Sequence, residues 1–178
     1  MNEPTSNPTA RIQQFLGVRP DYNPAASTFN ADQQPRPRLG LLCYGGQVLF
    51  LALPGDGDEL GILPTRLVGD PYTDRIHVIR GIDFWVGDRS LRNYPPNAFA
   101  DILLNDLLDD ILTGDFAAAA DDRAFARRLR ATGVPRVSGP CLILGRDEST
   151  DTSTGLPETF LDWLRRKAAQ AGDGPPTR

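Results

Sequence analysis

The chain has 178 residues, with 19 basic and 23 acidic side chains and a formal net charge of −4, and this length fits one domain with tails. One histidine and two cysteines exclude a multi-cysteine zinc site, a disulfide framework and an iron–sulfur centre. No apolar run approaches the ~20 residues that cross a bilayer, and the first residues lack the basic and apolar regions of a signal peptide. We therefore expect a cytoplasmic protein that does not contact a membrane.

The basic residues are almost all Arg (18 of 19), and 19 of the 23 acidic residues are Asp. Because the Arg residues are scattered along the chain, we interpret this bias as that of a GC-rich bacterial or phage genome. The alternative is selection for Arg because it forms bidentate contacts with carboxylate or phosphate.

Residues 1–38 are rich in Asn, Pro, Thr, Gln and Ala. Such a segment buries too little apolar surface to offset its ordering entropy, so we predict a disordered or draped N-terminal arm. Within it, Ile12, Phe15 and Leu16 have helical spacing before Gly17. One turn is not stable alone, so we expect these residues to dock on the domain or on a partner.

The predicted strands begin at Leu39. Two apolar runs, 39–44 and 47–53, flank Gly45-Gly46, the signal of a β-hairpin, and residues 54–58 are predicted to be a loop. Residues 75–86 alternate, with a bend, a bulge or a turn at Gly81. A further buried strand is predicted at 135–145.

Three helices follow from the apolar spacing. The first begins after the cap Asn97 and ends at Gly114, the second runs from its cap Asp115 to Ala131, and the third has Pro157 at its first position. The order of elements predicts an α+β fold, a small and mostly antiparallel sheet packed by about three helices. We expect a single domain at 39–171 and a disordered tail at 172–178.

The alternation in 75–86 puts His77 and Asp83 on the polar face of the sheet. A general-base role needs a nucleophile within reach, and no nucleophile-elbow motif supplies one, so a half-exposed structural histidine is the favoured interpretation. Cys43 and Cys141 lie in apolar runs and are interpreted as core residues. We expect no metal and no cofactor.

The segment 55–61, Gly-Asp-Gly-Asp-Glu-Leu-Gly, resembles two ligand-binding loops. A dinucleotide loop needs a helix to follow, and Ile62-Leu63-Pro64 is not expected to start one. A calcium loop needs oxygen ligands where Leu60 and Leu67 stand. An acidic turn is the favoured interpretation, with a weak ion site as the alternative.

The first predicted helix is strongly acidic, and the helix after it ends in a run of Arg. Solvated helix faces that complement the helix dipoles explain this pattern. The alternative is an acidic face that binds a basic partner or imitates DNA; its residues are Asp101, Asp106, Asp109 and Asp110. A pI of about 5.0 makes direct nucleic-acid binding unlikely.

The start of the same helix is a second candidate site. Two prolines precede Asn97, whose side chain caps the helix, and these residues have a sufficient structural role. The alternative is a weak anion site at the helix N-terminus, formed by Arg92, Tyr94 and Asn97.

Short turn and cap motifs between Val68 and Leu164 resemble a family of small phage, plasmid and bacterial proteins, domain of unknown function 3846. The similar segments are 67–72, 84–88, 94–100, 137–140 and 155–158. The arm, the hairpin at 39–53 and the stretch 109–132 depart from the pattern. The resemblance implies a fold and a mobile-element setting, and it implies no catalytic residues.

The sequence therefore favours a non-enzymatic protein that binds another macromolecule, with a protein as the expected partner and self-association allowed. One alternative is an acidic DNA mimic that inhibits a DNA-binding or restriction protein. Another is a small hydrolase-like enzyme that uses His77 and Asp83.

Overall fold

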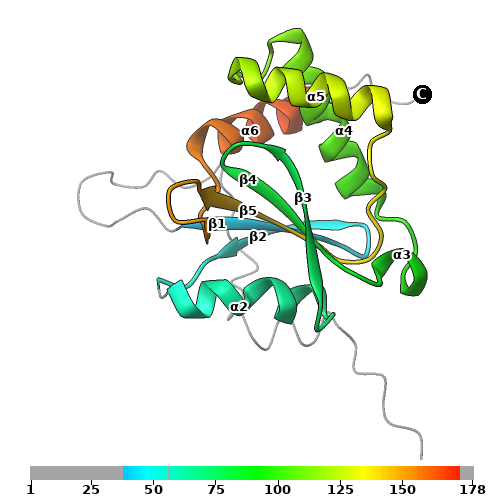
Figure 1. The fold of residues 1–178 in the computed structure, drawn as a ribbon, viewed down its shortest axis with the longest axis vertical. Helices are drawn as coiled ribbons and strands as arrows, with labels where there is room; N and C mark the ends of the chain where they lie inside the picture. The colour runs from blue at the N-terminus through cyan, green and yellow to red at the C-terminus, as the bar shows by residue number, and fades with distance from the viewer. Residues whose placement is uncertain (1–37, 56, 173–178) are drawn as a thin grey trace, which may run out of the picture. The chain divides into compact units, whose positions relative to one another are not determined.

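The computed structural model describes residues 38–55 and 57–172, which belong to one compact unit that begins at Arg38. Figure 1 shows how the elements are arranged. In chain order they are β1 (Leu39–Tyr44), β2 (Gln47–Ala52), α2 (Gly57–Val68), β3 (Thr73–Ile79), β4 (Ile82–Gly87), α3 (Ser90–Asn93), α4 (Ala98–Thr113), α5 (Ala120–Thr132), β5 (Cys141–Asp147), β6 (Thr152–Thr154) and α6 (Glu158–Gly172).

The strands form one sheet in the order β2-β1-β5-β4-β3, and β6 pairs with the end of β5. Every pair of neighbouring strands is antiparallel, so the predicted α+β class and antiparallel sheet are confirmed. The strand order makes β2 and β3 the two edges of the sheet. Each is one strand of a hairpin, β1–β2 or β3–β4.

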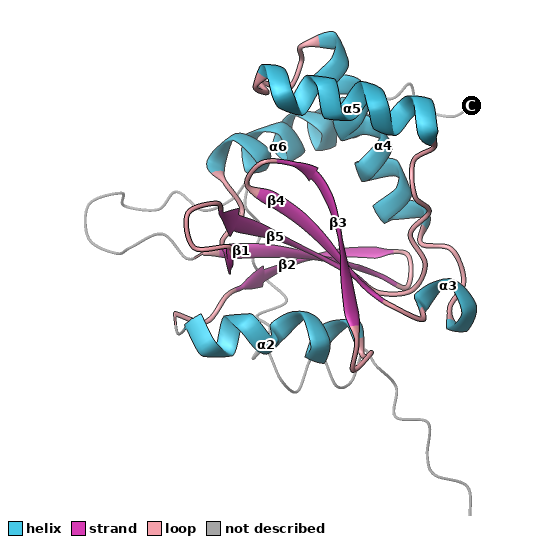
Figure 2. Cartoon of the chain, in the orientation of Figure 1, coloured by secondary structure: helices cyan, strands magenta, loops and turns pink. Residues whose placement is uncertain are grey.

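Helices cover both faces of the sheet (Figure 2), with α2 on one face and α4, α5 and α6 on the other. The larger core lies under α4 and α6, where Phe84 of β4 packs with Leu104 and Trp163 among fully buried side chains. The smaller core lies under α2, whose buried residues Leu60 and Leu63 face the sheet. A sheet covered in this way has few free surfaces apart from its edges.

The helix α2 corrects the prediction of a loop followed by a non-helical Ile62-Leu63-Pro64. The segment 57–68 is helical with Pro64 inside it. Proline removes one helical hydrogen bond, and here the burial of Leu60, Leu63 and Leu67 on one face of α2 outweighs that loss.

The second predicted helix also begins later than expected, at Ala120 and not after Asp115. The side chain of Asp115 accepts a hydrogen bond from the Thr113 hydroxyl, 2.8 Å away, and the Phe116 N–H donates to the Asp110 carbonyl. These bonds turn the chain so that Phe116 is buried against Trp163. Tertiary packing therefore fixes the start of α5.

The predicted turns and caps are largely confirmed. Gly45 and Gly46 have positive φ angles of 59° and 78°, as a two-residue hairpin turn requires. Asn97 caps α4 through a bond from the Ala100 N–H, and Gly114 ends it in the left-handed region.

The chain turns at Gly81 between β3 and β4, and β3 is also bulged between His77 and Ile79. Strand β5 begins at Cys141, six residues later than predicted, and the short elements α3 and β6 are not among the predicted ones.

At Gly145 the sheet leaves no room for a side chain. A Cβ atom there would collide with the backbone carbonyl of Gly155. Gly155 in turn lies against Arg38 at the start of β1. The backbones of β5 and of the residues after β6 therefore touch directly.

Candidate functional site

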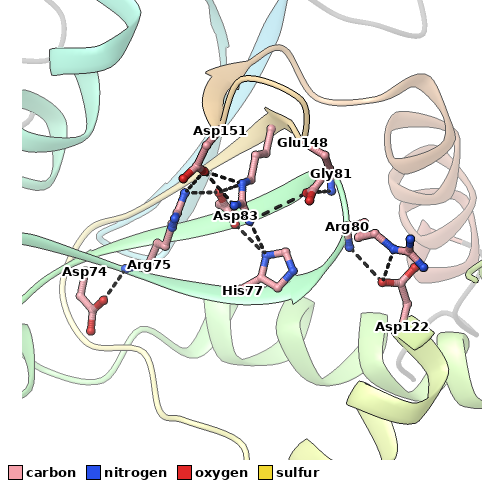
Figure 3. Close-up of polar contacts among 10 residues, drawn as sticks. Asp74, Arg75, His77, Arg80, Gly81, Asp83, Asp122, Glu148 and Asp151 are labelled. Carbon is pink, nitrogen blue, oxygen red and sulfur yellow. Dashed lines mark hydrogen bonds and ion pairs between the residues drawn. The ribbon is translucent and has the colours of Figure 1, made fainter.

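The histidine lies on edge strand β3, opposite Asp83 on β4. Its Nδ1 atom is 3.1 Å from Oδ1 of Asp83 (Figure 3). The Asp83 side chain is 3% exposed, whereas that of His77 is 36% exposed. A buried carboxylate thus orients the imidazole. The alternation of residues 75–86 predicts that the two side chains share a face, but not that Asp83 is buried.

Two arginines complete a charged group around Asp83, which we call the β3 cluster (Arg75, His77, Asp83, Arg146 and Asp151). Asp83 Oδ2 lies 3.5 Å from Nη1 of Arg75 and 4.0 Å from Nε of Arg146. Asp151 bridges the same two guanidinium groups at 2.9 and 2.8 Å. The hydrogen bond from Arg75, helped by Arg146, holds the pKa of Asp151 below its ordinary value. Two guanidinium groups and two carboxylates alternate in this cluster, and Arg146 also lies 3.8 Å from Oε1 of Glu148.

An open hollow of about 440 Å³ lies beside His77. Phe125 of α5 meets the imidazole edge-on, with ring centroids 6.1 Å apart, and Arg80 at the rim is paired with Asp121 and Asp122. The lining contains no Ser, Thr, Cys or Tyr. Chemically, this site could use His77 as a base on water, but its lining offers no hydroxyl or thiol nucleophile.

The outward backbone of β3 is partly occupied by contacts within the fold. The bond from the Asp88 N–H to the Tyr72 carbonyl fixes the alternation of the ladder, so the N–H groups of Thr73, Arg75 and His77 point away from β4. The Arg75 N–H donates to Asp74 Oδ1, 2.8 Å away. Past the bulge, the Arg80 N–H donates to Asp122 of α5. Local carboxylates and a bulge therefore occupy this edge.

The opposite edge has none of these features. The Leu53 N–H donates to the Arg38 carbonyl, and this pair continues the register of β1 and β2. Successive residues of an antiparallel strand direct their N–H and C=O groups alternately to its two sides. The groups of Val48, Phe50 and Ala52 therefore point away from β1. We call these outward groups the β2 edge. Among the described residues, β1 is the only strand paired with β2, and Val48 is 37% exposed.

Residues 39–55 contain no charged side chain, whereas charged residues make up 24% of the chain. The whole β1–β2 hairpin is therefore uncharged. This signal is present in the sequence, but the strand order that leaves β2 at an edge is not.

The four predicted carboxylates of α4 all have partners inside the fold. Asp101 accepts the Val137 N–H at 2.8 Å, and Asp109 lies 2.6 Å from Nη2 of Arg130 on α5. Asp106 lies 3.9 Å from Nζ of Lys167 on α6. These contacts connect α4 to its neighbours, so the acidic run is not simply a solvated face.

Asp110 makes the strongest of these connections. It accepts bonds from Trp163 Nε1 at 2.7 Å and from Lys167 Nζ at 2.9 Å. Burial acts to raise the pKa of Asp110, but the bonds from Lys167 and Trp163 outweigh it and lower the pKa. The same bond raises the pKa of Lys167. The carboxylate therefore ties α4 to α6.

The predicted anion site is built into the fold in a different way. The Asn97 amide donates to the carbonyls of Cys43 and Gly139, at 2.9 and 2.7 Å, while its oxygen caps α4. The Tyr94 ring packs so closely on Gly139 that a Cβ atom there would meet it, and Arg92 is exposed. Asn97 thus joins β1, α4 and the segment before β5, and its side chain is fully used by these bonds.

Both cysteines are buried and opposite each other on β1 and β5. Burial raises the pKa of the Cys43 thiol to about 12, and burial also raises that of Cys141, with smaller effects from Cys43 and Asp101. The predicted core role is confirmed. No group of three His, Cys, Asp or Glu side chains suited to a metal ion occurs within 38–55 and 57–172.

The predicted docking residues Ile12, Phe15 and Leu16 lie outside the described residues. No helix in the described part of the chain is long and apolar enough to cross a membrane.

Comparisons of the chain with models of protein families, with curated proteins and with solved structures found no match. The resemblance to domain of unknown function 3846 therefore stays a prediction. The two candidate functional features of the fold are the β3 cluster and the β2 edge.

Proposed function

We propose that this protein acts by binding another macromolecule, and that the partner is a protein that adds an extended segment to the β2 edge. The single observation that carries this proposal is that Val48, Phe50 and Ala52 direct their backbone N–H and C=O groups away from β1. An extended segment placed there gains a ladder of main-chain hydrogen bonds and covers the exposed Val48 side chain.

The surroundings of the β2 edge support the same function. Natural sheets protect their edge strands with charges, prolines or bulges because a free edge pairs with other chains. The strand Gln47–Ala52 has none of the three. An unprotected and uncharged edge strand is expected where its function is to pair with another polypeptide.

The acidic-mimic alternative has less support. A mimic needs carboxylates that are free to meet a basic partner, and Asp109 and Asp110 are paired with Arg130 and Lys167. The α4 carboxylates are therefore better explained as connections between helices.

The experiment compares the proteins that the wild-type chain and the Val48→Pro variant capture from a cell lysate. The Val48 N–H points outward, so proline removes a bond to the partner and none to β1. We expect capture that survives high salt, because the edge is uncharged, and that is lost in Val48→Pro. The nearly isosteric Val48→Thr is the matched control and should retain it. Equal capture by the proline variant and the wild type would overturn the proposal.

A second candidate, a small hydrolase-like enzyme, has one observation in its favour. His77 lines the hollow and is oriented by the buried Asp83, as a general base for water would be. The test is a panel of ester, phosphoester and amide substrates with wild type and His77→Gln. Hydrolysis that falls at least tenfold in the variant supports the enzyme, and identical rates in both proteins exclude it.

A further inference from the structure

We propose that the segment added at the β2 edge is β2 of a second copy of this chain, so that two sheets join across a two-fold axis. This inference rests on the proposed function and names its partner. In a two-fold arrangement the two strands run antiparallel, and the same residues of both copies form the junction.

The outward groups suit such self-pairing because they are symmetric about Phe50. If Phe50 faces Phe50 of the second copy, Val48 of each copy faces Ala52 of the other. All three outward residues of each strand then exchange N–H···O bonds, giving six bonds in all. A shift that centres the axis on Leu49 would place Ala52 beyond the paired residues and leave four bonds, so the geometry favours the register centred on Phe50.

The side chains at this junction are compatible with the same register. By the β1 register, Val48 and Phe50 lie on the face of Cys43 and Leu41, where α4 and α6 pack. Pairing would cover the exposed part of Val48 with the Ala52 side chain of the second copy and bring the two half-buried Phe50 rings together. Leu49 and Leu51 meet on the other face.

The ends of the strand also fit. Pro54 would lie opposite Gly46 of the second copy, and because proline has no N–H the ladder ends there. Gly46 has no side chain that would obstruct its neighbour. No charged residue occurs from Leu39 to Gly55, so no like charges face each other.

The first measurement is the mass of the full chain by sedimentation over a range of concentrations. We expect the wild type to change from 19.5 kDa to twice that mass as its concentration rises. Val48→Pro removes two of the six bonds, so its dimer dissociation constant should rise by about tenfold or more. Val48→Thr should dimerise like the wild type. Circular dichroism of each variant reports whether it is folded.

The second measurement tests the register without relying on proline. A chain carrying both Val48→Cys and Ala52→Cys should form a disulfide-linked dimer on mild oxidation, because these positions face each other across the axis at a separation that suits a disulfide. Each single variant is a matched control and should cross-link far less, since position 48 or 52 of one copy lies several residues away from its own equivalent. Because Cys43 lies directly opposite position 48 in the hairpin, all these variants are made in a Cys43→Ala background, which removes an internal disulfide between positions 43 and 48. Cys141 is buried and contributes little background.

The outcomes separate this inference from the proposed function. A wild type that stays monomeric at every concentration overturns the inference, and so does a dimer that is unchanged in Val48→Pro or a double variant that fails to cross-link. If capture of a host protein is nevertheless lost in Val48→Pro, the β2 edge binds a different polypeptide and the proposed function stands. If neither dimerisation nor capture depends on Val48, both proposals fail.

Discussion

The two edge strands of the sheet, β2 and β3, end the same ladder in opposite ways. At β3, Asp74 accepts the outward N–H of Arg75, a bulge interrupts the register and α5 supplies Asp122 to the chain just beyond the strand. At β2 the outward groups of Val48, Phe50 and Ala52 have no strand beside them in the described chain, and residues 39–55 carry no charged side chain. Within the described residues, the sheet therefore has one partly protected edge and one unprotected edge.

With one edge occupied, the protein can limit its own association. A sheet with two free edges can add copies at both sides without end, whereas a sheet with one free edge stops at a pair. Substitutions at or near either edge should therefore have different consequences.

The first prediction tests whether the unprotected edge is also firmly folded. Cys43 lies opposite Val48 in the β1–β2 hairpin, and burial raises its thiol pKa to about 12. Because the thiolate is the reactive form, a rise from 9.0 to about 12 should slow its modification at pH 8 by about a thousandfold relative to an exposed thiol. Rates with a thiol reagent, compared with the exposed site in Ala52→Cys, measure this effect.

The same pKa shift predicts how the stability of the fold depends on pH. An unfolded thiol ionises near 9 and the folded Cys43 thiol near 12, so alkaline solution favours the unfolded chain and stability falls above about pH 9. Rapid modification of Cys43 at pH 8 would show instead that the hairpin opens readily and that the unprotected edge is a frayed one.

The second prediction concerns the protected edge. Asp83→Ala leaves Arg75 and Arg146 without the buried carboxylate between them. Removing one partner of a buried ion pair leaves the other charge without compensation, so we expect a loss of about 2–3 kcal/mol in unfolding free energy. Urea denaturation followed by Trp fluorescence measures it. Asp151→Asn removes the exposed carboxylate of the same cluster and should cost much less; equal losses would show that burial of Asp83 is not what matters.

The third prediction removes the protection of β3. Asp74→Val frees the outward N–H of Arg75 and deletes a charge, so we expect self-association beyond the dimer to strengthen by roughly tenfold. Light scattering against concentration measures it. Asp74→Asn keeps an oxygen that can accept the same bond and should behave like the wild type. An Asp74→Val chain that forms no larger species would show that the bulge and α5 suffice to close this edge.

The fourth prediction compares the hairpin turns next to the two edges. Gly46 and Gly81 have φ angles of 78° and 81°, and an added Cβ meets no atom closely at either position. Alanine at each should therefore cost about 1 kcal/mol, from backbone strain alone. Thermal unfolding measures both. A much larger loss at Gly81 would mean that the β3–β4 turn makes contacts that the β1–β2 turn lacks.

The sequence predicts these two regions unequally. The β1–β2 hairpin is predictable because Gly45-Gly46 and the flanking apolar runs are local signals. Alternation likewise predicts that His77 and Asp83 share a face. Arg146 and Asp151 join them from a distant hairpin, and only the register of β4 with β5 brings them there.

The helices show the same limit. Asn97 and Gly114 mark the ends of α4 because cap chemistry depends on nearby residues. The acidic residues of α4 look solvated in the sequence because their partners, Arg130 and Lys167, belong to helices whose packing is a tertiary property. Pro64 hides α2 for the same reason, since burial of its apolar face offsets a poor local propensity.

The close contact of Gly145 with Gly155 has a consequence for tracing descent. No side chain fits between these two backbones, so any descendant of this chain that keeps the sheet must keep glycine at position 145, whatever happens to the residues around it. Two glycines ten residues apart, one late in a buried strand and one just before a proline-initiated helix, form a sparse fingerprint. Such a spacing can identify distant relatives after overall sequence similarity has faded.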